Sequence, residues 1–179
     1  MATNVFLERT FDIPHSAADV HARARQTGWC FDLHKVDWCS SFLAASGRRI
    51  VCWFSAPDVE SARLAIRQSG LDVRRLWPGT VHDAPEPAEP NVLVERSFDD
   101  PVTLEQIQAL EDASAWCLQA HNVKFARTFF SADRRRMVCL YQAPDAESVR
   151  LAQREAAMPL DAVWAFQRLD PGTMSQRAG

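Results

Sequence analysis

The sequence lacks the features that mark several large classes of protein. No apolar run approaches the ~20 residues that a membrane-spanning helix needs. The formal net charge of -3 and the pI near 5.9 give no basic surface for nucleic acid. The first residues place an acidic Glu8 where a secretion signal would have a positive charge and a long apolar run. We therefore expect a cytoplasmic protein with neither nucleic acid nor membrane as a partner.

Short catalytic and nucleotide-binding motifs are also missing. The chain has no glycine-rich phosphate loop, no G-x-S-x-G, no H-E-x-x-H and no paired C-x-x-C. Their absence disfavours nucleotide binding, serine hydrolysis and a structural zinc ribbon. The 5 cysteines are an odd number, which without a secretion signal predicts reduced thiols and no disulfide framework.

What the chain does contain is an internal repeat. Residues 91–170 repeat residues 4–83 without a gap, at a constant offset of 87 positions. NVFLERTFDIP, which begins at Asn4, is matched by NVLVERSFDDP, which begins at Asn91. RRIVCWFSAPDVESARLA, from Arg48, is matched by RRMVCLYQAPDAESVRLA, from Arg135. A period of this length is too long for a solenoid repeat, so each copy should be a domain-sized fold.

Hydrophobic patterns predict the same order of elements in both copies: strand, helix, β-hairpin, helix, strand. In the first copy the expected ranges are 4–11, 16–31, 36–54, 59–69 and 71–77. In the second copy the first strand, the two helices and the last strand are expected at 92–98, 103–118, 146–156 and 158–166. This is the βαββαβ order of a ferredoxin-like α+β fold, in which two helices cover one side of an antiparallel sheet.

The repeat also predicts how the chain is divided. We expect a first repeat at 1–83, a proline-rich linker at 84–90, a second repeat at 91–170 and a flexible tail at 171–179. Units of about 80 residues are marginal alone. Two of them are therefore expected to pack their bare sheet faces together as a pseudo-twofold dimeric α+β barrel, with homo-oligomers as a further option.

Several of the repeated runs resemble a known family. VERTFD and VERSFD, the His-x-Val pattern before an aromatic-rich strand, the Arg-Arg-x-Val-Cys strand and the APDxES turn are similar to short bacterial proteins of domain of unknown function 4242. These proteins are often labelled nickel-binding or nickel-responsive. The resemblance implies a ferredoxin-like fold and a divalent transition-metal site near His34 and His121. This sequence departs from the label in having a single repeated histidine in each copy.

A repeated C-x3-H spacing offers candidate metal ligands. Cys30 with His34, and Cys117 with His121, place a thiol and an imidazole one helical turn apart. Such ligands suit nickel, copper or zinc. Further ligands would have to come from the first or third strand of each copy: Glu8, Glu95, Cys52 or Cys139. The other interpretation is that the cysteines are buried thiols and that each histidine caps the negative end of a helix.

The glutamates of the first strands are the second candidate. Glu8 and Glu95 lie in the middle of their strands, where a charge is costly without a partner. Each could be a carboxylate in a half-apolar cavity, acting as a ligand or general base. Each could equally form a structural ion pair with an arginine such as Arg48 or Arg49. The sequence leaves open which face of the sheet they occupy.

The two copies differ at aromatic positions of the hairpin. Trp38 becomes Phe125, and Trp53 becomes Leu140. Most aromatic residues should belong to the core. Their divergence nevertheless favours an asymmetric pocket for an organic ligand over a symmetric metal store. His15, His21 and His82 have no counterparts in the other copy and are interpreted as surface residues.

Two main hypotheses for function follow, with a metal ion or a small molecule as the partner. The first is a nickel-type metal-binding protein that uses His34, His121, Cys30 and Cys117. The alternative is an enzyme acting on a small organic molecule between the two sheets, with metal assistance or with acid-base catalysis by histidine or glutamate. Its candidate catalytic residues are Glu8, Glu95, His34 and His121. A third hypothesis is an interaction module without a ligand.

Overall fold

The computed structural model describes residues 1–172 and divides the chain into two compact units. Unit 1 comprises Met1–Gly79 and the segment from Gln167 onward, and unit 2 comprises Thr80–Phe166. Most of the predicted tail, from residue 173, lies outside the described residues. In the described part of the chain, no helix is long and apolar enough to cross a membrane.

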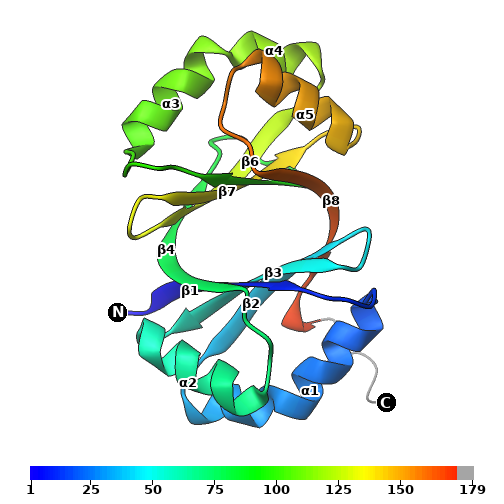
Figure 1. Cartoon of the computed structure of the whole chain (residues 1–179), viewed down its shortest axis with the longest axis vertical. Helices are drawn as coiled ribbons and strands as arrows, with labels where there is room; N and C mark the ends of the chain where they lie inside the picture. The colour runs from blue at the N-terminus through cyan, green and yellow to red at the C-terminus, as the bar shows by residue number, and fades with distance from the viewer. Residues whose placement is uncertain (173–179) are drawn as a thin grey trace. The chain divides into compact units, whose positions relative to one another are not determined.

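Unit 1 has the element order that the sequence predicts. Its elements are β1 (Thr3–Thr10), α1 (Ala17–Leu33), β2 (Asp37–Ala44), β3 (Arg49–Ala56), α2 (Val59–Ser69) and β4 (Arg75–Asp83). The strands are antiparallel in the order β4-β1-β3-β2. Figure 1 shows α1 and α2 on one face of this sheet. The unit is therefore a ferredoxin-like α+β arrangement with its core between helices and sheet.

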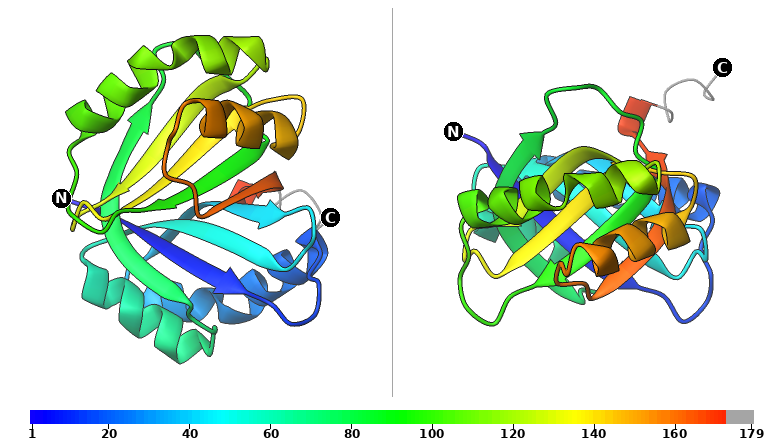
Figure 2. Two further views of the ribbon diagram at one scale, coloured as in Figure 1. Left: turned by 45° about the horizontal axis from the view of Figure 1, so that its top comes forward. Right: turned by 90° about the horizontal axis from the view of Figure 1, so that it is seen from above.

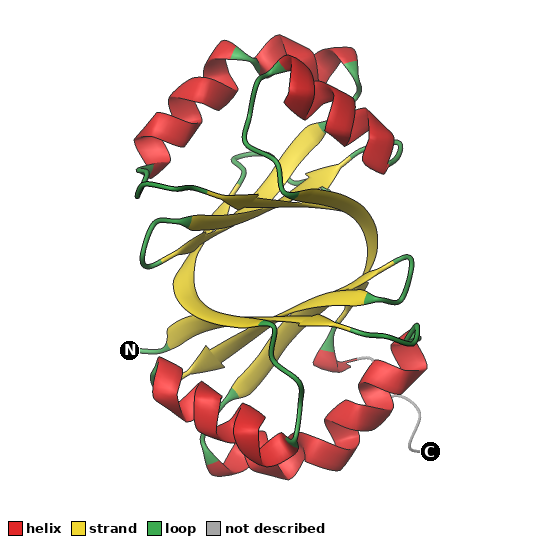
Figure 3. Cartoon of the chain, viewed as in Figure 1, coloured by secondary structure: helices red, strands yellow, loops and turns green. Residues whose placement is uncertain are grey.

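Unit 2 follows the same plan. Its elements are β5 (Val92–Ser97), α3 (Leu104–Ala113), α4 (Ala115–Ala120), β6 (Lys124–Ser131), β7 (Arg136–Gln142), α5 (Ala146–Glu155) and β8 (Ala162–Leu169). The strand order is β8-β5-β7-β6, again antiparallel. The colouring by secondary structure in Figure 3 and the turned views of Figure 2 show α3, α4 and α5 on one side of these strands.

The structure corrects the predicted elements in two places. The expected helix over 103–118 is interrupted at Ser114, whose φ of -117° and ψ of 14° end α3 and precede α4. The last strands of the two units, β4 and β8, begin at Arg75 and Ala162, later than the predicted starts at residues 71 and 158. Gly70 ends α2 in the left-handed conformation at φ 69°, so the residues after it first form a connector.

The backbone of the two units agrees position by position at the repeat offset. Arg9 pairs with Ile50 on β3, and Arg96 pairs with Met137 on β7, in matching register. Left-handed backbone also recurs at matching positions, such as Gly70 at φ 69° and Ala157 at φ 53°. A residue of one unit can therefore be compared with its counterpart 87 positions away. Descent from one ancestral unit and a barrel of the two units stay predictions.

Helix starts are fixed by the expected capping side chains. Ser16 and Asp19 form a capping box at the start of α1. Asp58 accepts a hydrogen bond from the Ser61 amide at 2.7 Å, and Asp145 does the same for Ser148 at 2.7 Å. All five cysteines are free thiols, as predicted.

Candidate functional site

The predicted metal ligands lie on the helical side of each unit. His34 follows the last residue of α1, and its Nε2 lies 2.8 Å from Gln68 Oε1 on α2. Cys30 is buried. In unit 2, His121 Nε2 lies 3.2 Å from Glu155 Oε2 on α5. Burial raises the pKa of the Cys117 thiol, and the Glu155 carboxylate raises it further.

These residues do not assemble a metal centre. Within residues 1–172, no group of three or more His, Cys, Asp and Glu side chains could hold a metal ion. The additional ligands that the site would need are also misplaced. Glu8 and Glu95 alternate with Leu7 and Val94, which belong to the cores beneath the helices, so both glutamates lie on the opposite face of the sheet.

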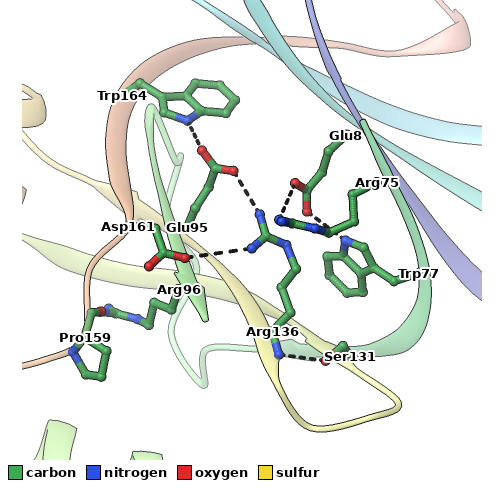
Figure 4. Close-up of polar contacts among 10 residues, drawn as sticks. All are labelled: Glu8, Arg75, Trp77, Glu95, Arg96, Ser131, Arg136, Pro159, Asp161 and Trp164. Atoms are coloured by element: carbon green, nitrogen blue, oxygen red, sulfur yellow. Dashed lines mark hydrogen bonds and ion pairs between the residues drawn. The ribbon is translucent and has the colours of Figure 1, made fainter. Parts of the chain in front are cut away.

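Glu8 is a buried carboxylate held by two side chains of β4. Its Oε1 accepts a hydrogen bond from Trp77 Nε1 at 2.8 Å, and its Oε2 lies 3.3 Å from Arg75 Nη1 (Figure 4). The predicted ion pair with an arginine is therefore present, with Arg75 as a partner.

Glu95 has a closely similar environment in unit 2. Trp164 Nε1 donates to its Oε2 at 3.0 Å, and Arg136 Nη2 donates to its Oε1 at 3.0 Å (Figure 4). Arg136 is the counterpart of Arg49 at the repeat offset. Trp77 and Trp164 also correspond to each other at the repeat offset. The acid-base roles suggested for both glutamates and for His34 and His121 stay predictions.

A pocket of about 800 Å³ lies between α1 and the sheet in unit 1. This volume is within the range of small-molecule sites, roughly 300–1,000 Å³. Only two residues of α1 are buried, Thr27 and Cys30, so the helix leaves space above the strands. The pocket is on the helix side, and thus on the other face of the sheet from Glu8. Its walls include residues of β1, β2 and β3 as well as α1.

Arg9 is the main charged group in the pocket wall. Its Nε donates to the backbone oxygen of Asp72 at 3.1 Å, and its guanidinium carbon lies 4.9 Å from the ring centroid of Phe11. None of the described carboxylates forms an ion pair with Arg9. Burial lowers the pKa of Arg9, the nearby Cys52 and Asp72 raise it, and Arg23 lowers it. A half-buried cation that lacks an ionic partner favours an anionic ligand.

Aromatic side chains form much of the remaining wall. Phe31 of α1 stacks on Phe54 of β3 with ring centroids 5.2 Å apart. Trp38 also faces the pocket, and its Nε1 donates to Ser41 Oγ at 2.9 Å. Burial raises the pKa of the Cys52 thiol, which therefore stays protonated at neutral pH and is no nucleophile. Flat apolar walls beside a half-buried guanidinium suit an organic anion with an apolar body.

His15 is a pocket residue that the sequence interpretation assigned to the surface. Its ring stacks on Phe11 at 3.9 Å, and its Nδ1 lies 2.9 Å from the Ile13 carbonyl oxygen. Because a carbonyl can only accept, Nδ1 carries the hydrogen of the neutral ring and Nε2 is left as an acceptor. The pocket therefore combines an anion-binding group with a base. The sequence could have identified Arg9 as a pocket residue. Successive side chains of a strand point to opposite faces of the sheet, so Arg9 lies on the same side as the core residue Leu7.

Comparisons with known proteins agree with the fold. Residues 93–165, within the second repeat, match a family model described as nickel responsive protein SCO4226-like. No curated protein sequence matches the chain. A putative chlorite dismutase, TA0507, is similar in structure with a TM-score of 0.53 at 11% identity, covering 99% of this chain and 99% of that chain. Chlorite dismutase from Candidatus Nitrospira defluvii in complex with imidazole gives a TM-score of 0.52 at 10% identity, covering 97% and 94%.

These findings overturn the leading hypothesis from the sequence. The two solved structures named above are chlorite dismutases, one of them putative, and their likeness to this chain concerns the fold alone. The predicted ligands, His34, His121, Cys30 and Cys117, form no metal-holding group among the described residues. The prediction of a nickel-type metal-binding protein is therefore wrong, while the matched family model is described as nickel responsive. The alternative, an enzyme acting on a small organic molecule, agrees better with these findings, although the prediction placed its site between the two sheets and the pocket of unit 1 lies under α1.

Proposed function

We propose that unit 1 binds a small organic anion with an aromatic or apolar body in the pocket under α1. The observation that carries the proposal is Arg9, a half-buried guanidinium without an ion pair in the described chain, at the wall of an 800 Å³ pocket. Charge-assisted hydrogen bonds to such a group are roughly twice as strong as neutral ones. The stacked rings of Phe31 and Phe54 provide apolar area for the rest of the ligand.

Aspartates at the rim of the pocket do not remove its preference for an anionic ligand. Asp19, Asp32, Asp37 and Asp72 also line the pocket, and all four are exposed. Asp19 Oδ2 already accepts hydrogen bonds from the amide and hydroxyl of Ser16. Exposed charges are screened by water and salt, whereas the half-buried Arg9 is screened less. A ligand bound near Arg9 is therefore attracted mainly by the guanidinium.

Titration calorimetry with phenylacetate, phenyl phosphate and benzenesulfonate tests the proposal. We expect at least one of these anions to bind, and the neutral 2-phenylacetamide to bind more weakly than phenylacetate. Arg9→Met should weaken binding about 10- to 100-fold, the equivalent of one lost charged hydrogen bond. Arg25→Met is the matched control, because Arg25 is an exposed α1 residue outside the pocket wall. If no anion binds, or if both variants behave alike, the proposal fails.

The second candidate is an enzyme that moves a proton on the bound anion, and His15 favours it. His15 Nε2 would take a proton from a carbon next to a carbonyl group of the ligand. The C–H electron pair would pass to the carbonyl oxygen as an enolate, and the same proton or one from solvent would return. Arg9 would hold the anionic end of the ligand without taking part in the transfer. A positioned general base contributes typically about 10² to 10⁴ in rate.

Proton exchange in deuterated water tests this second function. The methylene hydrogens of phenylpyruvate, followed by nuclear magnetic resonance, should exchange faster with the protein than in buffer. His15→Gln should return the exchange to the buffer rate. His82→Gln serves as the control, because His82 lies outside the pocket wall, where its Nε2 contacts Thr80 Oγ1. Exchange at the wild-type rate in the His15 variant would exclude this role.

A further inference from the structure

In unit 2, side chains of the protein bind the arginine that corresponds to Arg9. Arg96 is the counterpart of Arg9, occupies the same register on β5 and is fully buried. Its Nη1 donates to the Pro159 backbone oxygen at 2.7 Å. Its Nη2 donates to Tyr141 Oη at 3.1 Å and to Gln153 Oε1 at 2.7 Å. Two side-chain oxygens of the protein thus satisfy one terminal nitrogen of this arginine.

Unit 1 lacks both of these oxygens. The residues that correspond to Tyr141 and Gln153 are Phe54 and Ile66, which carry no acceptor. A third difference lies on α3. Glu111 Oε1 is 3.5 Å from Tyr141 Oη, and the residue of unit 1 that corresponds to Glu111 is Ala24. Unit 1 keeps the backbone contact. Asp72 corresponds to Pro159, and its backbone oxygen accepts a hydrogen bond from Arg9 as that of Pro159 does from Arg96.

The hydrogen bond between Arg9 and Asp72 leaves the two terminal nitrogens of Arg9 as donors for a ligand. Its Nε is used by Asp72, whereas Nη1 and Nη2 donate no hydrogen bond to any residue in the described range. The two terminal nitrogens of a guanidinium form a planar fork whose spacing matches the two oxygens of a carboxylate. Two oxygens of a phosphate or sulfonate can meet the same fork, so the free donors of Arg9 suit any of these oxyanions.

We infer that the ligand of unit 1 presents two oxygens of one anionic group to Nη1 and Nη2 of Arg9, and that the chain binds one equivalent because unit 2 supplies its own oxygens to Arg96. This inference rests on the proposed function and specifies its ligand as a bidentate oxyanion (carboxylate, phosphate or sulfonate) on an aromatic or apolar body. The side-chain oxygens of Tyr141 and Gln153 provide in unit 2 what the ligand oxygens provide in unit 1. The difference between the two units is therefore chemical, while their backbones agree.

Transferring the tyrosine of unit 2 into unit 1 tests the inference. Phe54→Tyr places a hydroxyl where Tyr141 has one, so it should compete for Arg9 and weaken phenylacetate binding about 10-fold or more. Phe98→Tyr is the control: it adds the same hydroxyl to a partly buried phenylalanine of unit 2, outside the pocket wall. The control should keep its affinity within about 3-fold of wild type, well inside one charged hydrogen bond.

Arg9→Lys adds a second, independent measurement. Lysine keeps the charge but has no fork, so anion binding should survive in weakened form. Calorimetry of wild type should give one equivalent of the anion that binds. Two equivalents, wild-type affinity of Arg9→Lys, or unchanged binding by Phe54→Tyr would overturn the inference and leave the anion site intact. Absence of binding by all three anions would instead refute the proposed function itself.

Discussion

At the residue scale, the two buried glutamates show what a sequence pattern can and cannot reveal. A charge in the middle of a strand needs a partner, and the structure provides one for both Glu8 and Glu95. The indole partners could not be predicted, because Trp77 lies 69 positions from Glu8 and aromatic content alone suggests only core packing. The same limit applies to the pocket. Arg9 is visible in the sequence, but its lack of an ion pair is visible only in three dimensions.

The indole of Trp77 should stabilise the fold through its hydrogen bond to Glu8. Trp77→Phe removes the N–H donor and with it one hydrogen bond of the buried Glu8 carboxylate. We expect the free energy of unfolding to fall by about 1.5–3 kcal/mol, the range for a hydrogen bond to a charged group. Urea unfolding followed by circular dichroism measures the change. Trp29→Phe is the control, since Trp29 is 61% exposed, and an equal effect of both substitutions would contradict the role given to the indole.

At the scale of elements, helix starts were predictable and strand starts were less so. Asp58 and Asp145 precede α2 and α5, where an aspartate caps the free amides of the first turn. These signals are local, so the sequence reveals them. The starts of β4 and β8 depend on pairing with β1 and β5, which are distant in the chain. The break at Ser114 was missed because the apolar spacing continues across it.

The capping aspartates should make stability depend on pH in acid. Hydrogen bonds from the Ser61 and Ser148 amides hold the pKa of Asp58 and Asp145 below the usual value. A lowered carboxyl pKa contributes stability above the pKa of the unfolded chain, and this contribution is lost as pH falls through the lowered value. Asparagine also caps helices but does not titrate. Asp58→Asn with Asp145→Asn should therefore reduce the loss of stability between about pH 6 and about pH 3.

Urea unfolding at both pH values measures this effect. Asp100→Asn is a suitable control, because Asp100 is an exposed residue outside the helices and strands. The control should lose as much stability in acid as the wild type does. A double variant with the full acid sensitivity of the wild type would show that the caps do not carry this dependence.

At the scale of the whole molecule, the repeat was the most informative feature of the sequence. A constant offset without gaps predicted two units of the same order, and the registers of β1 with β3 and β5 with β7 agree with it. The same repeat drew attention to residues present twice, such as His34 and His121. The pocket depends instead on residues that differ between the units. Tyr141 and Gln153 give Arg96 two side-chain oxygens that unit 1 does not give Arg9.

Trp38 gives unit 1 a built-in optical reporter. This indole stands in the wall of the pocket, whereas the corresponding position of unit 2 is Phe125. Its emission should respond to whatever displaces water beside it, so occupancy can be followed on the unlabelled protein by fluorescence. Subtracting the spectrum of Trp38→Phe isolates this signal from that of the other tryptophans. A screen of carboxylic acids can thus begin without a dye, a tag or a known reaction.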